Sequence, residues 1–172
     1  LRVIDLSPNR VGAQVSQLFA DFGAEVLWIE PPGGAALREH PAFAFWARGK
    51  QSVEIDLRSN AGQREIHDLA ATADVLIETF RPGTLDRRGL GFDMLSDANP
   101  RLVYTSITGF GPHGPASAIP GYEGLVAAKI GLLQAFARIM PLGRPPALAA
   151  PWCSFSASQV ALHATLAALF ER

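Results

Sequence analysis

The side chains best suited to chemistry follow two short apolar runs of the sequence. Residues 75–77 lead into a loop with Glu78 and Arg81, and residues 102–104 lead into a Gly/Pro-rich loop with His113. Both runs are rich in branched residues, which predicts fully buried strands of a parallel sheet. Ligands bind beyond the carboxyl ends of the strands in such sheets. We therefore expect the site at these two loops and at the equivalent turn after the first strand.

The loop at residues 109–114 matches the pattern G-x-G-x-x-G of dinucleotide-binding proteins. That pattern binds a dinucleotide where its glycines open a helix whose N-terminus holds the pyrophosphate. Here Pro112 and Pro115 interrupt the loop, and the turn after the first strand has only Gly12. The sequence thus predicts a rigid loop and disfavours a nicotinamide-dependent dehydrogenase.

Carboxylates near these loops suggest general acid–base catalysis, but their positions favour structural roles. Asp74 lies at a strand start, and Asp93 and Asp97 suit the caps and surface of a short helix. Glu78 and Asp86 belong to the same set, and the structural interpretation is favoured for the set as a whole.

The histidines are too scattered to share a metal ion, so no metal site is expected. His163 falls within an Ala/Leu-rich helix pattern and is expected to be packed or at the surface. His113 is the one candidate for chemistry, because it lies in a predicted site loop. The four positions are His40, His67, His113 and His163.

Three arginines, Arg81, Arg87 and Arg88, cluster after the strand at residues 74–77. One interpretation is a solvated helix end. The other is phosphate capture by forked guanidinium groups near helix N-termini. The place beyond a strand's carboxyl end keeps both interpretations open.

Composition describes an ordinary soluble domain. The 172 residues are 48% hydrophobic and 18% charged, with a net charge of −1 and no basic run, so nucleic acid is not an expected partner. The single cysteine, Cys153, favours a reducing cytoplasm. The sequence contains no continuous run of 18 apolar residues, so no membrane span is expected. The chain starts inside a strand pattern and ends in a helix pattern, so we expect a piece of a longer polypeptide.

Apolar periodicity predicts strands that alternate with helices. Strands are expected at residues 3–6, 25–30, 51–56, 74–77 and 102–107, and helices at residues 13–22, 42–48, 59–71, after Pro82, 123–136 and 156–170. Residues 138–152 are expected to be irregular, and the last two helices to be buried. Val15, Leu18, Phe19 and Phe22 should share the buried face of the first helix, which stops at Gly23.

This alternation predicts an α/β fold with a Rossmann-like, doubly wound parallel sheet. The strand at residues 51–56 alternates polar and apolar side chains, so we expect it near an edge of the sheet.

Three blocks of the sequence together resemble the family III CoA-transferases. They are residues 3–34, which contain VIDLSPNRVGAQ, residues 48–95, which contain ADVLIETFRPGTLDRRGLG, and residues 99–115, NPRLVYTSITGFGPHGP. The family also includes carnitine and formyl-CoA transferases and α-methylacyl-CoA racemases. The resemblance implies that residues 1–172 form the N-terminal segment of a split large domain, with the small domain and the C-terminal segment absent. It also implies interlocked subunits.

The resemblance places coenzyme A along the loops that follow the strands. Arg87 and Arg88 would face its phosphates. The family usually has Asn where Thr79 stands, and often a basic residue where Pro31 stands. The residues implied to line the nucleotide and pantetheine are Arg10, Val11, Ile55, Leu57, Thr79 and Phe80.

The expected catalytic centre departs from the family pattern. Family transferases carry an Asp just before the last helix here, and its carboxylate attacks the acyl-CoA thioester. Ser154 occupies that position, and no Asp or Glu lies between Glu123 and Glu171. Racemases resemble G-H-D where this chain has Tyr122 and Glu123, and tyrosine is a poor base near neutral pH. Glu123 is expected to order its loop rather than act as a base.

Two hypotheses remain open. The first is an enzyme that moves CoA between an acyl-CoA and a carboxylic acid, with the carboxylate replaced or supplied by a fused second domain or by a C-terminal part. The second is a CoA-binding or structural half without catalysis, which completes a homodimer or pairs with an active family III domain. Both place the protein in the cytoplasm, away from nucleic acid and membranes.

Overall fold

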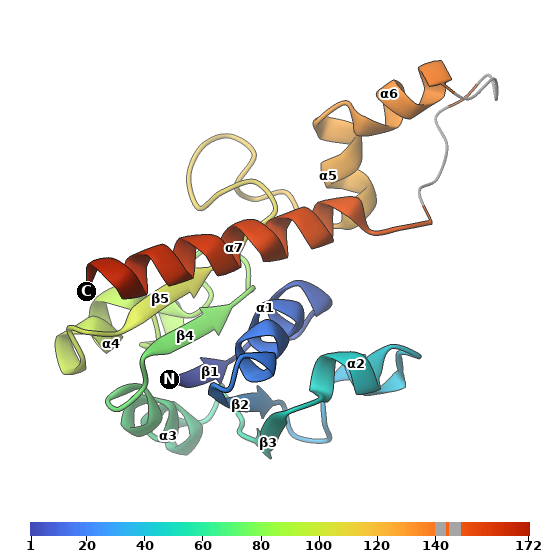
Figure 1. Ribbon diagram of the computed structural model, residues 1–172. Coiled ribbons are helices and arrows are strands. Elements are labelled where there is room, and N and C mark those ends of the chain that lie inside the picture. Colours follow the sequence, from blue (N-terminus) through green and yellow to red (C-terminus); the bar gives the residue numbers. More distant parts are fainter. Residues whose placement is uncertain (140–143, 145–148) are drawn as a thin grey trace.

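The computed structural model describes residues 1–139, 144 and 149–172. Its centre is a sheet of five parallel strands in the order β3-β2-β1-β4-β5 (Figure 1). This arrangement confirms the predicted doubly wound α/β fold. The strands are β1 (Arg2–Asp5), β2 (Glu25–Glu30), β3 (Lys50–Glu54), β4 (Val75–Glu78) and β5 (Val103–Ser106).

Helices cover both faces of the sheet. The N-terminal half of the chain contributes α1 (Arg10–Asp21), α2 (Phe43–Ala47), α3 (Asn60–Ala70) and α4 (Phe92–Ala98). The C-terminal part contributes α5 (Glu123–Lys129), α6 (Leu132–Ile139) and α7 (Trp152–Glu171). Short 3-10 turns occur at Ala36–Glu39 and Asp86–Arg88. Helices α1 and α7 lie on one face, and α3 lies on the other (Figure 1).

The alternation of side chains along the strands explains the two layers. Val75 and Ile77 of β4 pack in one cluster with Phe19 of α1. Leu76, between them, packs in the opposite cluster with Ile66 of α3. All three β4 residues are fully buried, as the branched run predicted. Because neighbouring parallel strands end at the same edge, the turns after β1, β4 and β5 are brought together there.

A buried ion pair lies between the sheet and α1. The ammonium of Lys50, on edge strand β3, lies 3.4 Å from Asp5 Oδ2 and donates to Ser16 Oγ at 2.6 Å and to the Ala13 carbonyl at 2.8 Å. It also sits 5.1 Å from the centroid of the Trp28 ring. Burial lowers the pKa of Lys50, and the Asp5 carboxylate acts against that shift. The pair therefore ties the edge strand to the centre of the sheet.

Several expectations about burial are wrong. Strand β5 is the outer strand of the sheet, so Val103 and Tyr104 are only half-buried, although Leu102 before them is buried. Phe22 is 88% exposed rather than buried, because α1 ends at Asp21 and Phe22 is its C-terminal cap. Gly23 has φ +88°, as its predicted role as the helix stop requires.

The predicted helix boundaries also need correction. Residues 123–136 do not form one helix, because Gly131 adopts φ +76° and separates α5 from α6. These helices are largely exposed, and of their residues only Ala127 is buried. No helix begins at Pro82; the 3-10 turn Asp86–Arg88 and then α4 follow instead. Most of the irregular segment expected at residues 138–152 lies outside the described residues.

Helix α7 starts at Trp152, four residues earlier than predicted, and runs across α1 and β5 (Figure 1). By length and composition it is apolar enough to cross a membrane, a test that the buried core helices of soluble proteins also pass. Only 11% of this apolar stretch is buried, so the expectation of a buried helix is wrong. Thr165 Oγ1 lies 2.7 Å from Thr105 Oγ1 of β5, and Ser158 Oγ donates to the Val11 carbonyl at 3.0 Å. These contacts hold one side of α7 on the sheet and on the start of α1.

Candidate functional site

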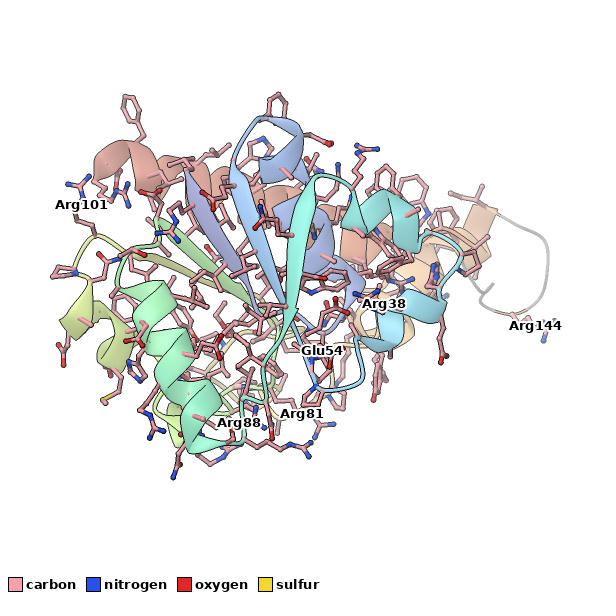
Figure 2. The ribbon with its side chains drawn as sticks, turned by 90° about the horizontal axis from the view of Figure 1, so that it is seen from below. Arg38, Glu54, Arg81, Arg88, Arg101 and Arg144 are labelled. Atoms are coloured by element: carbon pink, nitrogen blue, oxygen red, sulfur yellow. The ribbon has the colours of Figure 1, made fainter. Side chains whose placement is uncertain are left out.

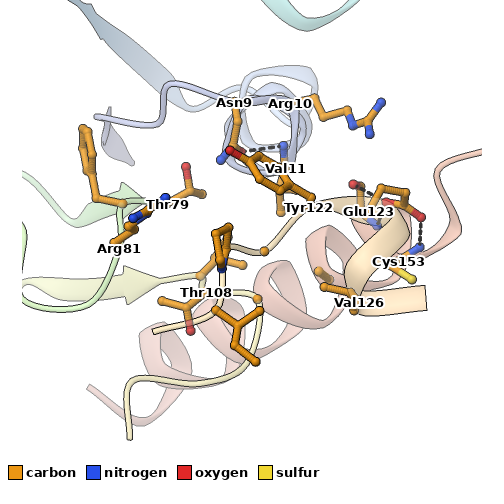
Figure 3. A pocket seen from close by; sticks show the side chains of 18 of the residues that line it. Asn9, Arg10, Val11, Thr79, Arg81, Thr108, Tyr122, Glu123, Val126 and Cys153 are labelled. Atoms are coloured by element: carbon orange, nitrogen blue, oxygen red, sulfur yellow. Dashed lines mark hydrogen bonds between the residues drawn. The ribbon is translucent and has the colours of Figure 1, made fainter. Parts of the chain in front are cut away.

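Two cavities open at the carboxyl ends of the strands. The first, of about 360 Å³, lies between the turns after β1, β4 and β5 and the starts of α5 and α7, and we name it the α7 cavity (Figure 3). The second, also of about 360 Å³, lies beyond the ends of β2 and β3, and we name it the β3 cavity. Phe80 lines both cavities, so they adjoin at the loop after β4.

The turn after β1 forms the boundary between the two cavities. Asn9 caps α1, since its side-chain oxygen accepts a hydrogen bond from the Val11 amide at 3.1 Å. Gly12 packs so closely on this turn that an added Cβ would lie 1.8 Å from Ser7 Oγ. The buried hydroxyls of Ser7 and Thr79 have no hydrogen-bond partner among the described residues. Buried hydroxyls normally have a partner, so these two are exceptions within the described chain.

In the α7 cavity, Glu123 is the carboxylate closest to α7. Its Oε1 accepts from the Cys153 amide at 2.8 Å, and its Oε2 accepts from the Ser154 amide at 2.9 Å and from Ser154 Oγ at 2.6 Å (Figure 3). Burial acts to raise the pKa of Glu123, but these hydrogen bonds outweigh it, and the pKa is lowered. The side chain is therefore an anion held against the first turn of α7, and a weak base.

A close approach of two glycines positions Glu123. The loop after β5 contacts the segment before α5 at Gly109 and Gly121, where a Cβ on Gly109 would lie 2.3 Å from Gly121 Cα. Neither residue has a side chain in the way, so the two backbones touch. This contact carries the start of α5 across the end of the sheet to the start of α7.

The β3 cavity combines apolar walls with charged groups of both signs, since Glu30 and Asp56 line it as well as two arginines. Ile55 and Leu57 line it from the segment after β3, and Arg58 and Arg88 add two guanidinium groups. The Arg88 guanidinium lies 5.9 Å from the centroid of the Phe80 ring. Sequence analysis missed Arg58, although it directly follows the strand end at residues 55–57 and is the nearest basic residue to it.

Buried carboxylates shape the loops around the β3 cavity. Glu30, at the end of β2, accepts from Arg38 Nε at 2.7 Å and from the Ala35 amide at 2.8 Å, which fixes the loop after β2. Its pKa is lowered chiefly by the hydrogen bond from Arg38. Burial raises the pKa of Glu78, whose carboxyl group accepts from the Phe80 amide at 2.7 Å. Glu78 thus holds the backbone that presents Phe80 to both cavities.

The structure brings most of the predicted residues to these two cavities. The α7 cavity is lined by Arg10, Val11, Thr79, Phe80, Glu123 and Ser154, and the β3 cavity by Ile55, Leu57, Phe80 and Arg88.

The arginine cluster and His113 are placed differently from what the sequence suggested. Arg81 lines the α7 cavity and Arg88 lines the β3 cavity, and both arginines are labelled in Figure 2. Arg87 is exposed and lines neither cavity. His113 is also exposed and outside both lining sets. His163 is exposed on α7.

Few of the side chains that line the α7 cavity can take part in acid–base or nucleophilic chemistry. Among the described residues that line it, Glu123 is the only carboxylate and none is a histidine. Within the described part of the chain, no group of three His, Cys, Asp or Glu side chains could hold a metal ion. Burial, with the nearby Glu123 carboxylate, raises the pKa of the Cys153 thiol, which therefore stays neutral. What remains is a carboxylate surrounded by hydrogen-bond donors.

Comparisons with known proteins agree with this architecture. Residues 1–172 match the family model described as CoA-transferase family III. A probable fatty acyl-CoA transferase of Mycobacterium tuberculosis, Rv3272, is 37% identical over 99% of this chain and 46% of its own. Its crystal structure superposes with a TM-score of 0.92, covering 100% of this chain and 50% of that one.

Two further relatives show the range of similar proteins. The succinyl-CoA–L-malate CoA-transferase beta subunit of Chloroflexus aurantiacus is 39% identical over 84% of this chain and 38% of its own. The CoA-transferase/lyase DddD of a Marinomonas species is 35% identical over 100% of this chain but only 21% of its own. The chain therefore spans half or less of the length of these relatives.

Proposed function

Because the chain belongs to CoA-transferase family III, we propose that it binds an acyl-CoA at the carboxyl ends of its sheet and forms part of a protein that moves CoA between an acyl-CoA and a carboxylic acid. The observation that carries this proposal is the pair of adjoining cavities. Arg58 and Arg88 line the β3 cavity, and the α7 cavity holds the Glu123 carboxylate together with Arg10 and Arg81. One extended ligand with a phosphate end and a thioester end could occupy both cavities.

The adjoining cavities suggest how CoA would lie. Its phosphates would face Arg58 and Arg88, and Ile55 and Leu57 would pack against the nucleotide. The pantetheine arm would pass Phe80 and Thr79, whose buried hydroxyl has no partner within the described chain. The thioester would then enter the α7 cavity. Donor and acceptor classes named for the relatives, fatty acyl, succinyl and malate, mark the kind of acids to test first.

Position 154 cannot carry the covalent cycle in this proposal. Ser154 lies in the first turn of α7, at the cavity wall. A serine hydroxyl can form an ester with the acyl group, but it has no carboxyl carbon for the CoA thiolate to attack. A transfer that holds CoA on the protein needs a carboxylate, from this chain or from another part of the protein.

The second candidate function is a CoA-binding half without catalysis, paired with an active family III domain. It is favoured by large apolar side chains that this chain leaves bare, such as Phe22 at 88% and Phe170 at 94% exposure. This chain covers 21% of DddD against 46% of Rv3272, so DddD is more than twice as long, which is long enough for a second domain of this kind. A homodimer would cover such side chains equally well.

Calorimetric titration of the intact protein with free CoA tests the proposal. We expect saturable binding, because arginines and apolar side chains line the two adjoining cavities. Absence of binding at millimolar CoA would overturn the proposed function. Saturable binding without any CoA transfer from an acyl-CoA to an acid would favour the second candidate.

The charge at the β3 cavity gives a specific prediction. Arg88→Ala should weaken CoA binding about fivefold, which corresponds to about 1 kcal/mol for one guanidinium–phosphate contact near the surface. The difference in CoA affinity between the parent and Arg88→Ala should shrink as salt is added, since screening weakens the guanidinium–phosphate contact in the parent protein. Titrations at low and high ionic strength measure both effects.

Arg87→Ala is the matched control for this prediction, because Arg87 belongs to the same 3-10 turn but lines neither cavity. Its effect on CoA affinity should be smaller than that of Arg88→Ala. If the parent and Arg88→Ala bind CoA with equal affinity at every salt concentration, Arg88 does not contribute to CoA binding.

A further inference from the structure

The α7 cavity retains a carboxylate next to position 154, although position 154 itself is serine. Glu123 comes from the start of α5, 31 residues away in sequence from Ser154, and its Oε2 lies 2.6 Å from Ser154 Oγ. A carboxylate and a hydroxyl at hydrogen-bond distance occupy nearly the same region of the cavity. Glu123 is also the only carboxylate among the described residues that line this cavity.

The Glu123 carboxylate is both fixed and accessible. Its side chain is half-buried and lines the cavity, so a ligand there can reach it. Oε1 accepts from the Cys153 amide at 2.8 Å, and the Cys153 side chain is also hydrogen-bonded to the carboxylate. The lowered pKa keeps the group ionised at neutral pH, and a carboxylate nucleophile has to be ionised.

We propose that Glu123 is the nucleophile of this site and carries CoA as a γ-glutamyl thioester. The inference rests on the proposed function, because it needs an acyl-CoA in the α7 cavity. It assigns the covalent step to a residue of α5 in place of one at position 154.

The steps balance without any further reagent. A Glu123 oxygen attacks the thioester carbonyl carbon, the carbon–sulfur bond breaks, and CoA leaves as thiolate, with an acyl–glutamyl anhydride on the protein. The thiolate attacks the Glu123 carboxyl carbon, the anhydride carbon–oxygen bond breaks, and the donor acid leaves as carboxylate. The acceptor carboxylate then reverses both steps, so it takes CoA and Glu123 returns to its free anion.

The donors around Glu123 suit the second of these steps. When the thiolate attacks the Glu123 carboxyl carbon, negative charge develops on a glutamyl oxygen. The Ser154 amide and hydroxyl already point at Oε2, at 2.9 and 2.6 Å, and the Cys153 amide points at Oε1. Preorganised donors at such distances stabilise an oxyanion. Ser154 is thereby a hydrogen-bond donor to the reacting group.

A purely structural role for Glu123 makes a different prediction. Pro151, the N-cap residue of α7, makes no side-chain capping bond, and Glu123 satisfies the amides of Cys153 and Ser154 instead. A cap of this kind stabilises α7 but never becomes covalently attached to CoA. Detection of a covalent adduct therefore distinguishes the two roles, whereas the stability of a variant does not.

The test traps the adduct on the intact, unmutated protein. The protein is incubated in turn with acetyl-, propionyl-, succinyl- and palmitoyl-CoA and treated with hydroxylamine, which converts a glutamyl thioester or anhydride into a hydroxamate. Peptide mass spectrometry then locates the label. We expect a hydroxamate at Glu123 with at least one donor. CoA titration on the same sample measures binding independently.

Variants assign the role of each group. Glu123→Gln should lower the label by at least about 100-fold, since an amide is not a nucleophile. Ser154→Ala keeps the carboxylate and removes one donor, so the label should form about 10²-fold more slowly. Glu65→Gln, an exposed position on α3, is the matched control and should label like the parent.

The outcomes are distinguishable. Saturable CoA binding with no label from any of the four donors overturns the inference and leaves the proposed function in place. A label at Ser154, at Cys153 or at a carboxylate elsewhere in the protein overturns it as well. Absence of CoA binding overturns both proposals. A label at Glu123 of the parent protein supports the inference, and its loss in Glu123→Gln supports it further. The result on the parent protein does not depend on how stable that variant is.

Discussion

Asp5→Asn should lower the free energy of unfolding by about 3–5 kcal/mol, the usual cost of removing one partner of a buried ion pair. Both side chains of the Asp5–Lys50 pair are at most 1% exposed. Asp5 also accepts hydrogen bonds from the Ser7 amide, at 2.8 Å, and from the Ser16 hydroxyl. The substitution would leave the Lys50 ammonium inside the protein without an anion.

The loss should depend on pH in a defined direction. Burial already lowers the pKa of Lys50 in the folded protein, and the loss of Asp5 removes the group that opposes this shift. Between the lowered folded pKa and the unfolded value of 10.5, the unfolded chain binds more protons. Stability of Asp5→Asn should therefore rise with pH across this alkaline window, and the full cost should be present below the folded pKa.

Denaturant unfolding of the intact protein at several pH values measures both effects. Lys50→Met is the complementary variant, and it should cost less because Asp5 keeps its bonds from Ser7 and Ser16. Asp68→Asn, exposed on α3, is the control and should stay within about 0.5 kcal/mol of the parent. An Asp5→Asn variant as stable as this control would show that the pair contributes nothing to stability.

Local patterns were sufficient to predict the sheet. Strand β2 was predicted at residues 25–30, where it is found, and the branched run at residues 75–77 forms the fully buried β4. The alternating run after Lys50 was predicted near an edge, and β3 is an edge strand. The same rules failed for β5, because a short apolar run looks alike whether the strand is central or outer.

Burial of single side chains was harder to predict. Phe22 continues the apolar spacing of α1 but falls one residue past its end, so helix periodicity no longer applies to it. Lys50 is polar and starts an edge strand, yet it is buried because α1 packs Ser16 and Ala13 over it. Such contacts depend on how a helix lies across the sheet, which no local pattern records.

For the candidate site, the sequence predicted the segments better than the contacts. The turn after β1 and the loops after β4 and β5 do line one cavity, as parallel topology requires. The hydrogen bonds between Glu123 and Ser154 were not foreseen, because they join the starts of two helices separated by 31 residues. Gly109 and Gly121 can be read from the sequence, but only their close approach in the structure shows why both positions are glycine.

That glycine contact leads to the second large effect. Under the proposal that Glu123 is the nucleophile of a CoA transfer, Gly121→Ala should lower that transfer in the intact protein by about 10²-fold, the usual result of moving a reacting group by about 1 Å. A Cβ on Gly121 would lie 2.8 Å from Gly109 Cα and 3.0 Å from Gly109 N. Both atoms are backbone, so the segment before α5 has to shift, and Glu123 lies only two residues further along.

Hydrogen exchange gives a measurement that does not depend on activity. The amides of Cys153 and Ser154 donate to Glu123, so both should exchange faster in Gly121→Ala if the carboxylate is displaced. Gly124→Ala is the matched control, because a Cβ there meets open space and alanine favours the helix by about 0.5–1 kcal/mol. Unchanged protection of both amides in Gly121→Ala would mean that Glu123 is held by α7 itself, and that the glycine contact does not position it.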